Sequence, residues 1–325
     1  MQSIGVDDED GLPVRTCRPG DVLAEDPVYG DLRAVEPLGI GRRCETWLVW
    51  STRLWHPAVL KLARPHQVEH PRARRTLERE VAALAGRPVH PVLPRLLSDG
   101  AGARTPYLLL EYVDGPTLAD EIDEHGPLEP VETALLGTQL LSAVAALHLR
   151  GLAHLDVKTE NVVLRDGRPM LIDFGSARRL GSQQPPGQPV GTAGYAAPEL
   201  DACAPVSVAM DLYGVGTVLV ESLTGEPFPD RPALASGLAS GLASGLASGL
   251  ASGLASGLAQ SPLGALVGRL VAPDPADRGT IAEALLDFAP LCGDDARPWP
   301  EWADARLRVG APRSAAGASY LPAWR

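Results

Sequence analysis

The sequence predicts an α+β fold with two lobes, in which a small β-rich lobe with one main helix precedes a larger, mainly helical lobe. The chain has 325 residues, enough for one large domain or two lobes with a sizeable core. Up to Val113 most apolar runs are short and bounded by turn residues, which is typical of strands. Beyond Asp114 they lengthen and take helical spacing, so the boundary between the lobes is expected here.

The first lobe is expected to span residues 32–113. Two strands around a glycine-containing turn are predicted by AVEPLGIGRRCETWLVWS, and two further strands by PAVLKLA and YLLLEYV. One helix is predicted over residues 71–86, where apolar residues recur at helical spacing and the run ends on Gly86. Residues 1–31 are rich in Asp, Pro and Gly and are predicted to be a flexible lead-in.

The second lobe is expected to span residues 114–289. Thr117 is predicted to cap a short helix that stops at Gly126. Residues 130–151 and 208–225 are apolar on nearly all sides, which predicts two buried helices. The remaining predicted elements are helices over residues 263–272 and 280–291 and strands over residues 162–165 and 169–175.

Two segments outside this pattern carry no predicted chemistry. Residues 235–258 are six copies of Ala-Ser-Gly-Leu. A four-residue period drifts by about 40° per repeat around a helix of 3.6 residues per turn, so no face stays apolar. We interpret this insert as a length-variable expansion, with a partner-binding role as the alternative. Residues 290–325 are predicted to be an irregular C-terminal extension.

Composition excludes several classes of partner. The net charge of −11 argues against unaided binding to nucleic acid or to an anionic membrane, because both surfaces would repel the chain. The N-terminal stretch lacks the apolar core of a signal peptide, and no apolar run of about 18 residues is free of Gly, Ser or charge. The four cysteines show no metal-binding spacing. We therefore expect a cytoplasmic protein with reduced thiols and no membrane insertion.

Two residue types are rare enough to draw attention. Of the 29 basic residues only Lys61 and Lys158 are lysine, and Asn161 is the single asparagine. In a chain so rich in arginine, a retained lysine indicates chemistry that needs the compact charge of an ammonium group rather than the planar guanidinium of arginine.

The stretch HLDVKTENVV, residues 154–163, contains Asp156, Lys158 and Asn161 in one loop before a predicted strand. Transfer of a phosphoryl group from a nucleotide needs a carboxylate that orients a hydroxyl, a cation for the phosphate and oxygen ligands for Mg²⁺. These three residues supply one group each, and Asp173 is a second candidate metal ligand. Each residue alone is more simply a polar turn residue; the ordered set is what indicates the chemistry.

Further groups in the first lobe are candidates for holding a nucleotide. Gly39 and Gly41 lie in the predicted hairpin turn, where a backbone without Cβ atoms approaches phosphate oxygens closely, although many such turns are only turns. Lys61 lies inside an apolar strand, where its charge is costly unless paired; a lysine reaching solvent from an edge strand is the alternative. Glu80 is the natural partner on the predicted helix, with Glu78 as its competitor.

Together, HLDVKTEN, DFG, the strand lysine Lys61 and GTAGYAAPE (residues 191–199) resemble the eukaryotic-like, Hanks-type serine/threonine protein kinases of bacteria. The resemblance runs from Leu38 to Ala289, and several separate motifs in fixed order make it specific. It implies the bilobal protein-kinase fold over residues 32–289. It also implies ATP and Mg²⁺, with Mn²⁺ as an alternative ion, protein substrates carrying Ser or Thr, and autophosphorylation as a further expectation.

The resemblance also implies roles for individual residues. Lys61 would pair with Glu80 and the α- and β-phosphates, under a loop containing Gly39 and Gly41. Asp156 would be the catalytic base. The other implied roles are metal ligands at Asn161 and Asp173, an adenine-binding hinge from Glu111 to Val113 behind a gatekeeper at Leu110, and a substrate segment at Thr192, where it would meet Asp156 and Lys158.

Three structural residues complete this set. Asp211 resembles the residue that anchors the catalytic loop, and Glu199 with Arg278 resembles the buried ion pair at the end of the activation segment. Lys158 and the GT before GYAAPE favour Ser or Thr over Tyr as the acceptor.

The chain departs from the family pattern at two positions. Cys44 replaces the third glycine of the phosphate loop, and Leu155 stands where the family usually has an arginine before the catalytic aspartate. That arginine normally pairs with a phosphate on the activation loop, which a leucine cannot do. We therefore predict that activity does not depend on activation-loop phosphorylation, although Ser176 and Ser182 remain available for it.

Two other functions stay open from the sequence. A pseudokinase scaffold would bind nucleotide or partners without catalysis; the departure at Cys44 and the repeat favour it weakly, and the intact Lys61, Asp156, Asn161 and Asp173 argue against it. A kinase acting on small molecules is the other alternative, but such enzymes lack the GTAGYAAPE segment.

Overall fold

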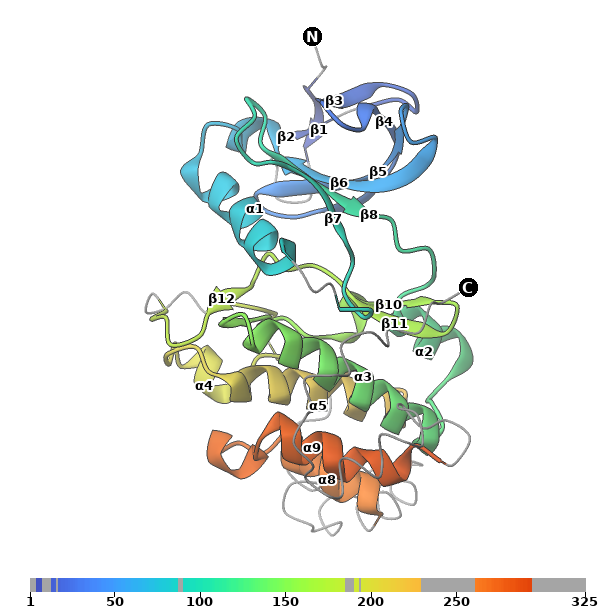
Figure 1. Cartoon of the computed structure of the whole chain (residues 1–325), viewed down its shortest axis with the longest axis vertical. Helices are drawn as coiled ribbons and strands as arrows, with labels where there is room; N and C mark the ends of the chain where they lie inside the picture. Colours follow the sequence, from blue (N-terminus) through green and yellow to red (C-terminus); the bar gives the residue numbers. More distant parts are fainter. Residues whose placement is uncertain are drawn as a thin grey trace, which may run out of the picture.

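The chain folds into an upper β-rich lobe and a lower helical lobe (Figure 1). The structure is a computed structural model, and it describes residues 4–7, 13–15, 17–86, 90–184, 190–192, 194–228 and 261–293. The predicted α+β, two-lobed fold is confirmed. The Ala-Ser-Gly-Leu insert and nearly all of the predicted C-terminal extension lie outside the described residues.

The upper lobe is built on one antiparallel sheet of six strands in the order β3-β4-β5-β6-β8-β7. The strands are β3 (Val22–Asp26), β4 (Gly30–Ile40), β5 (Cys44–Ser51), β6 (His56–Ala63), β7 (Leu96–Gly100) and β8 (Tyr107–Glu111). The predicted strands correspond to β4, β5, β6 and β8; β7 is an additional one. Its sequence LLSDG is short and half polar, so pairing with β8 rather than local pattern determines it.

The predicted flexible lead-in over residues 1–31 is wrong for Val22–Asp26. This segment forms β3, which pairs with β4 and buries Leu23. Asp26 is also buried and accepts a hydrogen bond of 2.7 Å from the Tyr107 hydroxyl. Two short strands precede it, β1 (Ile4–Asp7) and β2 (Pro13–Arg15). A contact between residues 81 positions apart leaves no signal in the local pattern, which is why the sequence missed this strand.

Strand alternation decides which way Lys61 faces. Leu60 and Leu62 belong to the apolar cluster on one side of the sheet, so Lys61 between them faces the other side. That side carries α1 (Pro71–Leu84), the helix predicted over residues 71–86. Its buried residues include Leu77, Glu80 and Leu84, one face of the helix.

The lower lobe is centred on two long antiparallel helices, α3 (Pro130–His148) and α5 (Val208–Thr224), which pack side by side (Figure 1). Around them lie α2 (Leu118–His125), α4 (Pro198–Asp201), α8 (Pro262–Leu270) and α9 (Ile281–Phe288), with short 3₁₀ turns η2 (Thr159–Asn161), η5 (Pro275–Arg278) and η6 (Ala289–Leu291). One further 3₁₀ turn, η1 (Pro65–Gln67), lies between β6 and α1 in the upper lobe. All fifteen residues from Ala209 to Leu223 are buried, as their continuous apolar pattern predicts.

Local capping signals are confirmed at α2. The Thr117 hydroxyl accepts a hydrogen bond from the Asp120 amide, and the Asp120 side chain accepts one from the Thr117 amide. Gly126 ends the helix with φ of 85°, a conformation that glycine adopts without strain.

Two short antiparallel sheets of two strands each lie between the lobes. One pairs β10 (Val162–Arg165) with β11 (Arg168–Leu171), and the other pairs β9 (Leu152–Ala153) with β12 (Arg178–Arg179). The strand predicted over residues 169–175 is therefore too long, since β11 ends at Leu171. Asp173 has φ of 59°, so the chain leaves the extended conformation at this point.

Among the described helices, α3 alone is long and apolar enough to span a membrane by length and composition. Just over half of its apolar window, 56%, is buried inside the protein. Leu140, Leu141 and Val144 belong to the apolar cluster that also includes Leu108 and Leu110 from β8. The apolar side chains of α3 thus pack into the hydrophobic core that joins the two lobes.

Candidate active site

The first cluster of functional side chains joins the two lobes through Lys61. Its ammonium lies 2.8 Å from Oδ1 of Asp173 and also forms an ion pair with Glu80. Glu80 is fully buried, and its competitor Glu78 is exposed. Lys61 comes from β6, Glu80 from α1 and Asp173 from the turn after β11. The cluster therefore forms only when these three elements are correctly positioned relative to one another.

Lys61 and Asp173 favour each other's charged forms, whereas burial raises the pKa of Glu80 to about 7. Burial opposes the charge on Lys61, yet the carboxylates of Glu80 and Asp173 raise the pKa of its ammonium above the usual value. The nearby Lys61 cation lowers the pKa of Asp173 to about 2, against the opposing effect of burial. Both groups are therefore charged throughout the neutral pH range.

Gly175 closes this cluster on one side. A Cβ at this position would lie 3.2 Å from Oδ1 of Asp173, 3.3 Å from Oε1 of Glu80 and 3.5 Å from Nζ of Lys61. A methyl group here would be in tight contact with the charged atoms, which would have to shift by a few tenths of an ångström, so glycine is favoured by packing rather than by backbone conformation.

A cavity of about 350 Å³ opens beside this cluster. It is lined by the β4–β5 turn with Gly39, Gly41 and Cys44, and by Lys61 and Asp173. The turn is closed by a hydrogen bond of 2.9 Å from the Gly41 amide to the Cys44 carbonyl. Burial raises the pKa of the Cys44 thiol to about 12, so a neutral thiol lines the cavity where the family has a third glycine.

A second cluster surrounds Asp156 in the loop after β9. Thr192 Oγ1 donates a hydrogen bond of 2.8 Å to Asp156 Oδ1. The Asn161 amide donates to the Asp156 carbonyl at 2.9 Å and to Asp156 Oδ2 at 3.3 Å. Thr192 thus meets Asp156 as expected. Lys158 has its nearest carboxylate at Glu160, 3.8 Å away, so its expected contact with Thr192 stays a prediction.

The loop is anchored from below by the buried Asp211 of α5. Its carboxylate accepts hydrogen bonds of 2.8 Å from the amides of His154 and Leu155 and from Nε2 of His148. These bonds hold Leu155 at φ of 66°, a conformation that a leucine avoids without support. Gly191 packs against this point, since a Cβ there would lie 2.5 Å from the Leu155 carbonyl oxygen.

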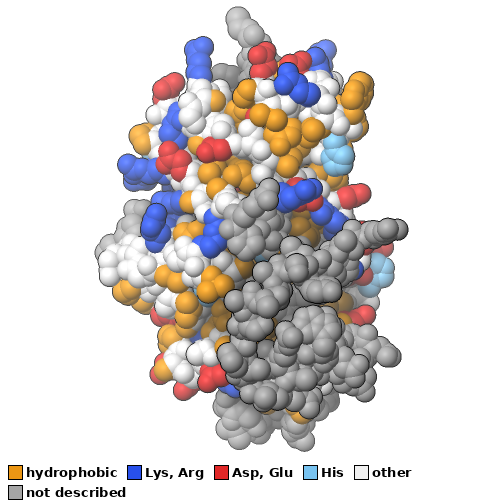
Figure 2. Space-filling model, viewed as in Figure 1, with side chains coloured by type: hydrophobic (Ala, Val, Ile, Leu, Met, Phe, Trp, Pro, Cys, Tyr) orange, Lys and Arg blue, Asp and Glu red, His pale blue; other side chains and the backbone are white. Residues whose placement is uncertain are grey.

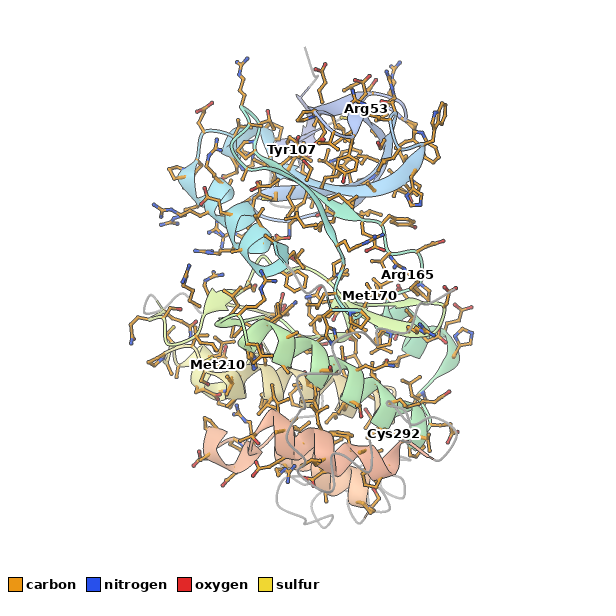
Figure 3. The ribbon with its side chains drawn as sticks, in the orientation of Figure 1. Arg53, Tyr107, Arg165, Met170, Met210 and Cys292 are labelled. Atoms are coloured by element: carbon orange, nitrogen blue, oxygen red, sulfur yellow. The ribbon has the colours of Figure 1, made fainter. Side chains whose placement is uncertain are left out.

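The expected adenine hinge forms the connection after β8. Glu111 accepts hydrogen bonds from Arg165 at 2.8 Å and from Arg95 at 3.1 Å, and Arg165 also donates to the Tyr112 carbonyl at 2.9 Å. Figure 3 shows Arg165 beside this connection, near the β10–β11 hairpin. Val113 is buried. The Glu111 side chain therefore stiffens this connection, and its carboxylate is occupied by Arg95 and Arg165.

Glu199 and Arg278 form a two-pronged ion pair with distances of 2.6 and 2.9 Å. Arg278 is fully buried, donates to the Ala272 and Ala209 carbonyls and stacks over the Tyr213 ring at 4.8 Å. This pairing ties the segment after Thr192 to the lower lobe.

The sequence reasoning missed Arg150, which follows α3 in the chain. Its guanidinium donates to the carbonyls of Ala82, Ala83 and Ala85 at the end of α1. That helix has no basic residue in its last turn, so Arg150 supplies both the missing hydrogen bonds and the favourable charge. An arginine after the long helix is unremarkable in sequence, and only its position in space reveals the contact.

Replacing Arg150 with alanine is expected to lower the free energy of unfolding by about 1 kcal/mol and to raise the KM for ATP severalfold. The KM effect follows because α1 carries Glu80, the partner of Lys61. Melting temperature and steady-state kinetics measure the two effects. Arg53→Ala is the control, because Arg53 also donates to a backbone carbonyl, Pro27 at 2.8 Å, but lies at the top of the upper lobe (Figure 3). Equal KM changes in both variants would contradict this role.

The donor set fits a divalent metal ion. Asn161 uses its amide nitrogen for Asp156, which leaves its side-chain oxygen available. Within the described part of the chain, the hydrogen bonds to the Asp173 carboxylate are accepted by Oδ1, which leaves Oδ2 available to bind a metal ion. Oxygen ligands of this kind suit Mg²⁺, which is held by one or two carboxylates together with substrate phosphates and water. No group of three or more His, Cys, Asp or Glu side chains among the described residues forms a separate metal cage.

Comparisons with known proteins agree with this arrangement of residues. The protein kinase domain family matches residues 32–287. Serine/threonine-protein kinase PkaA of Streptomyces coelicolor is 35% identical over 223 residues, covering 62% of this chain and 40% of that protein. Serine/threonine-protein kinase PknB of Mycolicibacterium smegmatis is 32% identical over 201 residues, covering 59% and 32%. The matched region is thus less than half the length of these relatives.

A solved structure gives the same result for the fold. The crystal structure of a point mutant of the PknI kinase domain of Mycobacterium tuberculosis superposes with a TM-score of 0.61. It has 27% sequence identity and covers 86% of this chain and 100% of that one.

Proposed function

The chain belongs to the protein kinase family, and from this premise we propose that it transfers the γ-phosphoryl group of ATP to serine or threonine hydroxyls of proteins. The observation that carries the proposal is the hydrogen bond of 2.8 Å from Thr192 Oγ1 to Asp156 Oδ1. A hydroxyl of the substrate class already lies against the carboxylate that would act as base. We assign residues 32–289 to one catalytic domain.

Each group in the cluster has a role in this reaction. Lys61, held by Glu80, binds the α- and β-phosphates in the cavity below Gly39 and Gly41. Asn161 and Asp173 would hold Mg²⁺, which would supply positive charge to neutralise the phosphates.

The residues proposed to act on the acceptor hydroxyl lie in the loop after β9. Asp156 orients the acceptor hydroxyl and takes its proton as the oxygen attacks the γ-phosphorus. Lys158 lies two residues further on and places a positive charge near the transferring group.

Serine and threonine acceptors are favoured by Lys158 and by the glycine–threonine pair at Gly191 and Thr192, and the relatives are serine/threonine kinases by name. We propose cytoplasmic proteins as substrates, since ATP is supplied there, and autophosphorylation as a further activity. Mn²⁺ would serve in place of Mg²⁺.

Transfer of radiolabel from ATP to the protein itself and to a generic basic protein tests the proposed activity. We expect incorporation with the wild type and background incorporation with Lys61→Ala. Wild-type protein that binds Mg-ATP yet transfers no more label than this variant would overturn the proposal and favour the pseudokinase scaffold.

We also propose that activity is independent of activation-loop phosphorylation. Leu155 is apolar and 4% exposed, so it offers no partner for a phosphate, and Asp211 already holds the loop through the backbone. Phosphatase-treated enzyme and the Ser176→Ala/Ser182→Ala variant are expected to keep wild-type initial rates to within about twofold. Short assays, with mass spectrometry to follow new phosphorylation, measure this. A tenfold loss in either preparation would show dependence on the phosphate.

A further inference from the structure

The β4–β5 turn, residues 39–44, lines the proposed nucleotide cavity but gains little support from its own side chains. Leu38 and Ile40, at its start, are each 46% exposed, and apolar side chains reach the surface elsewhere in the upper lobe too, as Figure 2 shows in orange. None of the described residues 39–44 has a positive φ, so no left-handed glycine fixes the turn. Hydrogen bonds from neighbouring elements therefore decide where it lies.

Arg64 follows β6 and reaches this turn from the adjacent strand. β5 and β6 lie side by side (Figure 1), and at this end of the two strands the last paired residues are Cys44 and Ala63. The Arg64 amide continues the pairing, since it donates to the Arg43 carbonyl at 3.0 Å. Its guanidinium donates from Nη1 to the Gly41 carbonyl at 3.3 Å. One residue thus bonds to the turn at two carbonyl groups.

The position of Arg64 is itself well fixed. Its side chain is 1% exposed, and the following Pro65 favours the extended backbone that it adopts, with φ of −58° and ψ of 152°. Hydrogen bonds from a charged donor are about twice as strong as those between neutral groups. Because Gly41 is exposed, water would replace this bond if it were lost, and an open turn would then compete with the closed one.

Arg64 lies behind the turn rather than in the nucleotide site. Side chains alternate along an extended chain, so Arg64 and Leu62 lie on the face opposite Lys61. The cavity lining includes Lys61 but not Arg64. It also includes Arg42 and Arg43, so a turn that is held from the far side keeps two further positive charges beside the phosphate end of the cavity.

We propose that Arg64 is a positioning residue that holds the β4–β5 turn closed over the phosphate end of the nucleotide cavity. It acts through the Gly41 and Arg43 carbonyls and touches no reacting group. The closed position of the turn can be measured without any nucleotide. Its consequence for nucleotide affinity rests on the proposed function.

The thiol of Cys44 reports whether the turn is closed. It belongs to the turn, is 5% exposed and has its pKa raised to about 12 by burial, so it should react slowly with a thiol reagent. The full chain is alkylated with iodoacetamide in the absence of nucleotide, and mass spectrometry follows each cysteine. We expect Cys44 to be labelled at least about tenfold faster in Arg64→Met than in the wild type.

Two controls separate opening of the turn from a general loss of stability. Cys292 is fully buried in the lower lobe, so its labelling rate should be the same in Arg64→Met and the wild type. Arg33→Met is the matched variant, because Arg33 also donates to a backbone carbonyl, Gly20 at 2.9 Å, from β4 but away from the turn. It should leave Cys44 as slow as in the wild type. Unchanged labelling of Cys44 in Arg64→Met, or equal acceleration at Cys44 and Cys292, would refute the proposal.

If Arg64→Met does not fold, Arg64→Lys takes its place in the same experiment. Lysine keeps the buried positive charge, but its shorter side chain lacks the fork of donors and is expected to fall short of the Gly41 carbonyl. The same selective acceleration at Cys44 is expected. Its absence would count against the proposal in the same way.

Calorimetry with adenosine and with a non-hydrolysable ATP analogue plus Mg²⁺ measures the effect on nucleotide affinity. Only the analogue carries phosphates, so the Arg64 variant should bind the analogue at least about tenfold more weakly and adenosine within about twofold of the wild type. Equal losses for both ligands would contradict the positioning role. A wild type that binds neither ligand would contradict the proposed function instead, and the labelling of Cys44 would still decide whether Arg64 holds the turn.

Discussion

Asparagine in place of Asp156 is expected to lower kcat by about 10³-fold, with little change in the KM for ATP or in stability. The amide has the shape of the carboxylate but cannot take the acceptor proton. Its oxygen still accepts the hydrogen bond from Thr192, and only the longer bond of 3.3 Å from the Asn161 amide to Oδ2 is lost. The bond from Asn161 to the Asp156 carbonyl and the backbone bonds to Asp211 do not involve the side chain, so they hold the loop in place. Initial rates of phosphoryl transfer to a protein substrate, over a range of ATP concentrations, measure the effect.

Asp166→Asn is the matched control for this substitution. Asp166 lies in the β10–β11 turn with φ of 50°, a conformation that asparagine tolerates as well as aspartate does. The control should keep the wild-type kcat. If Asp156→Asn retained more than about a tenth of kcat, a general base at this position would be ruled out, since such a base contributes at least about 100-fold.

Alanine in place of Arg278 is expected to lower the free energy of unfolding by about 3–5 kcal/mol. The substitution leaves the Glu199 carboxylate, 15% exposed, without its cation, and also removes the hydrogen bonds to the Ala272 and Ala209 carbonyls. Breaking one partner of a buried pair is costly because the other charge stays out of water. Denaturant unfolding followed by fluorescence measures the change. The denaturant concentration at the midpoint should fall, while the m value, the slope of the free energy of unfolding against denaturant concentration, stays the same.

The chain offers a matched control in Arg269, which forms a salt bridge of 2.6 Å with Asp287 at the surface. The Arg269 and Asp287 side chains are 35% and 49% exposed, so the pair is solvent-screened and Arg269→Ala is expected to cost at most about 1 kcal/mol. Similar losses in the two variants would mean that burial does not govern the Arg278 pair.

Much of the fold was predictable because the signals are local. The two central helices have apolar residues on nearly every side; α5 is buried along almost its whole length, and just over half of the apolar window of α3 is buried. Thr117 and Gly126 mark the ends of α2 with chemistry that acts within one turn. By contrast, β3 and β7 were missed because each depends on a partner strand for its backbone hydrogen bonds.

The choice of partner for Lys61 was open in the sequence. Glu78 and Glu80 are two residues apart on a helix, so their side chains point in clearly different directions. Docking of α1 on the sheet buries Glu80 beside Lys61 and leaves Glu78 at the surface. The position of a helix against a sheet is a tertiary property, and no local pattern specifies it.

By itself, the sequence determined which groups are available for phosphoryl transfer, because a lysine inside a strand is followed in a fixed order by two aspartates and the single asparagine in turns and loops. The tertiary structure alone decided which of them meet. Asp156 and Thr192 are 36 residues apart, Lys61 and Asp173 are 112 apart, and Arg150 reaches the end of α1 from the other lobe. The physical reason is that chain order limits only near neighbours, whereas contacts across the core are chosen by the packing of whole elements.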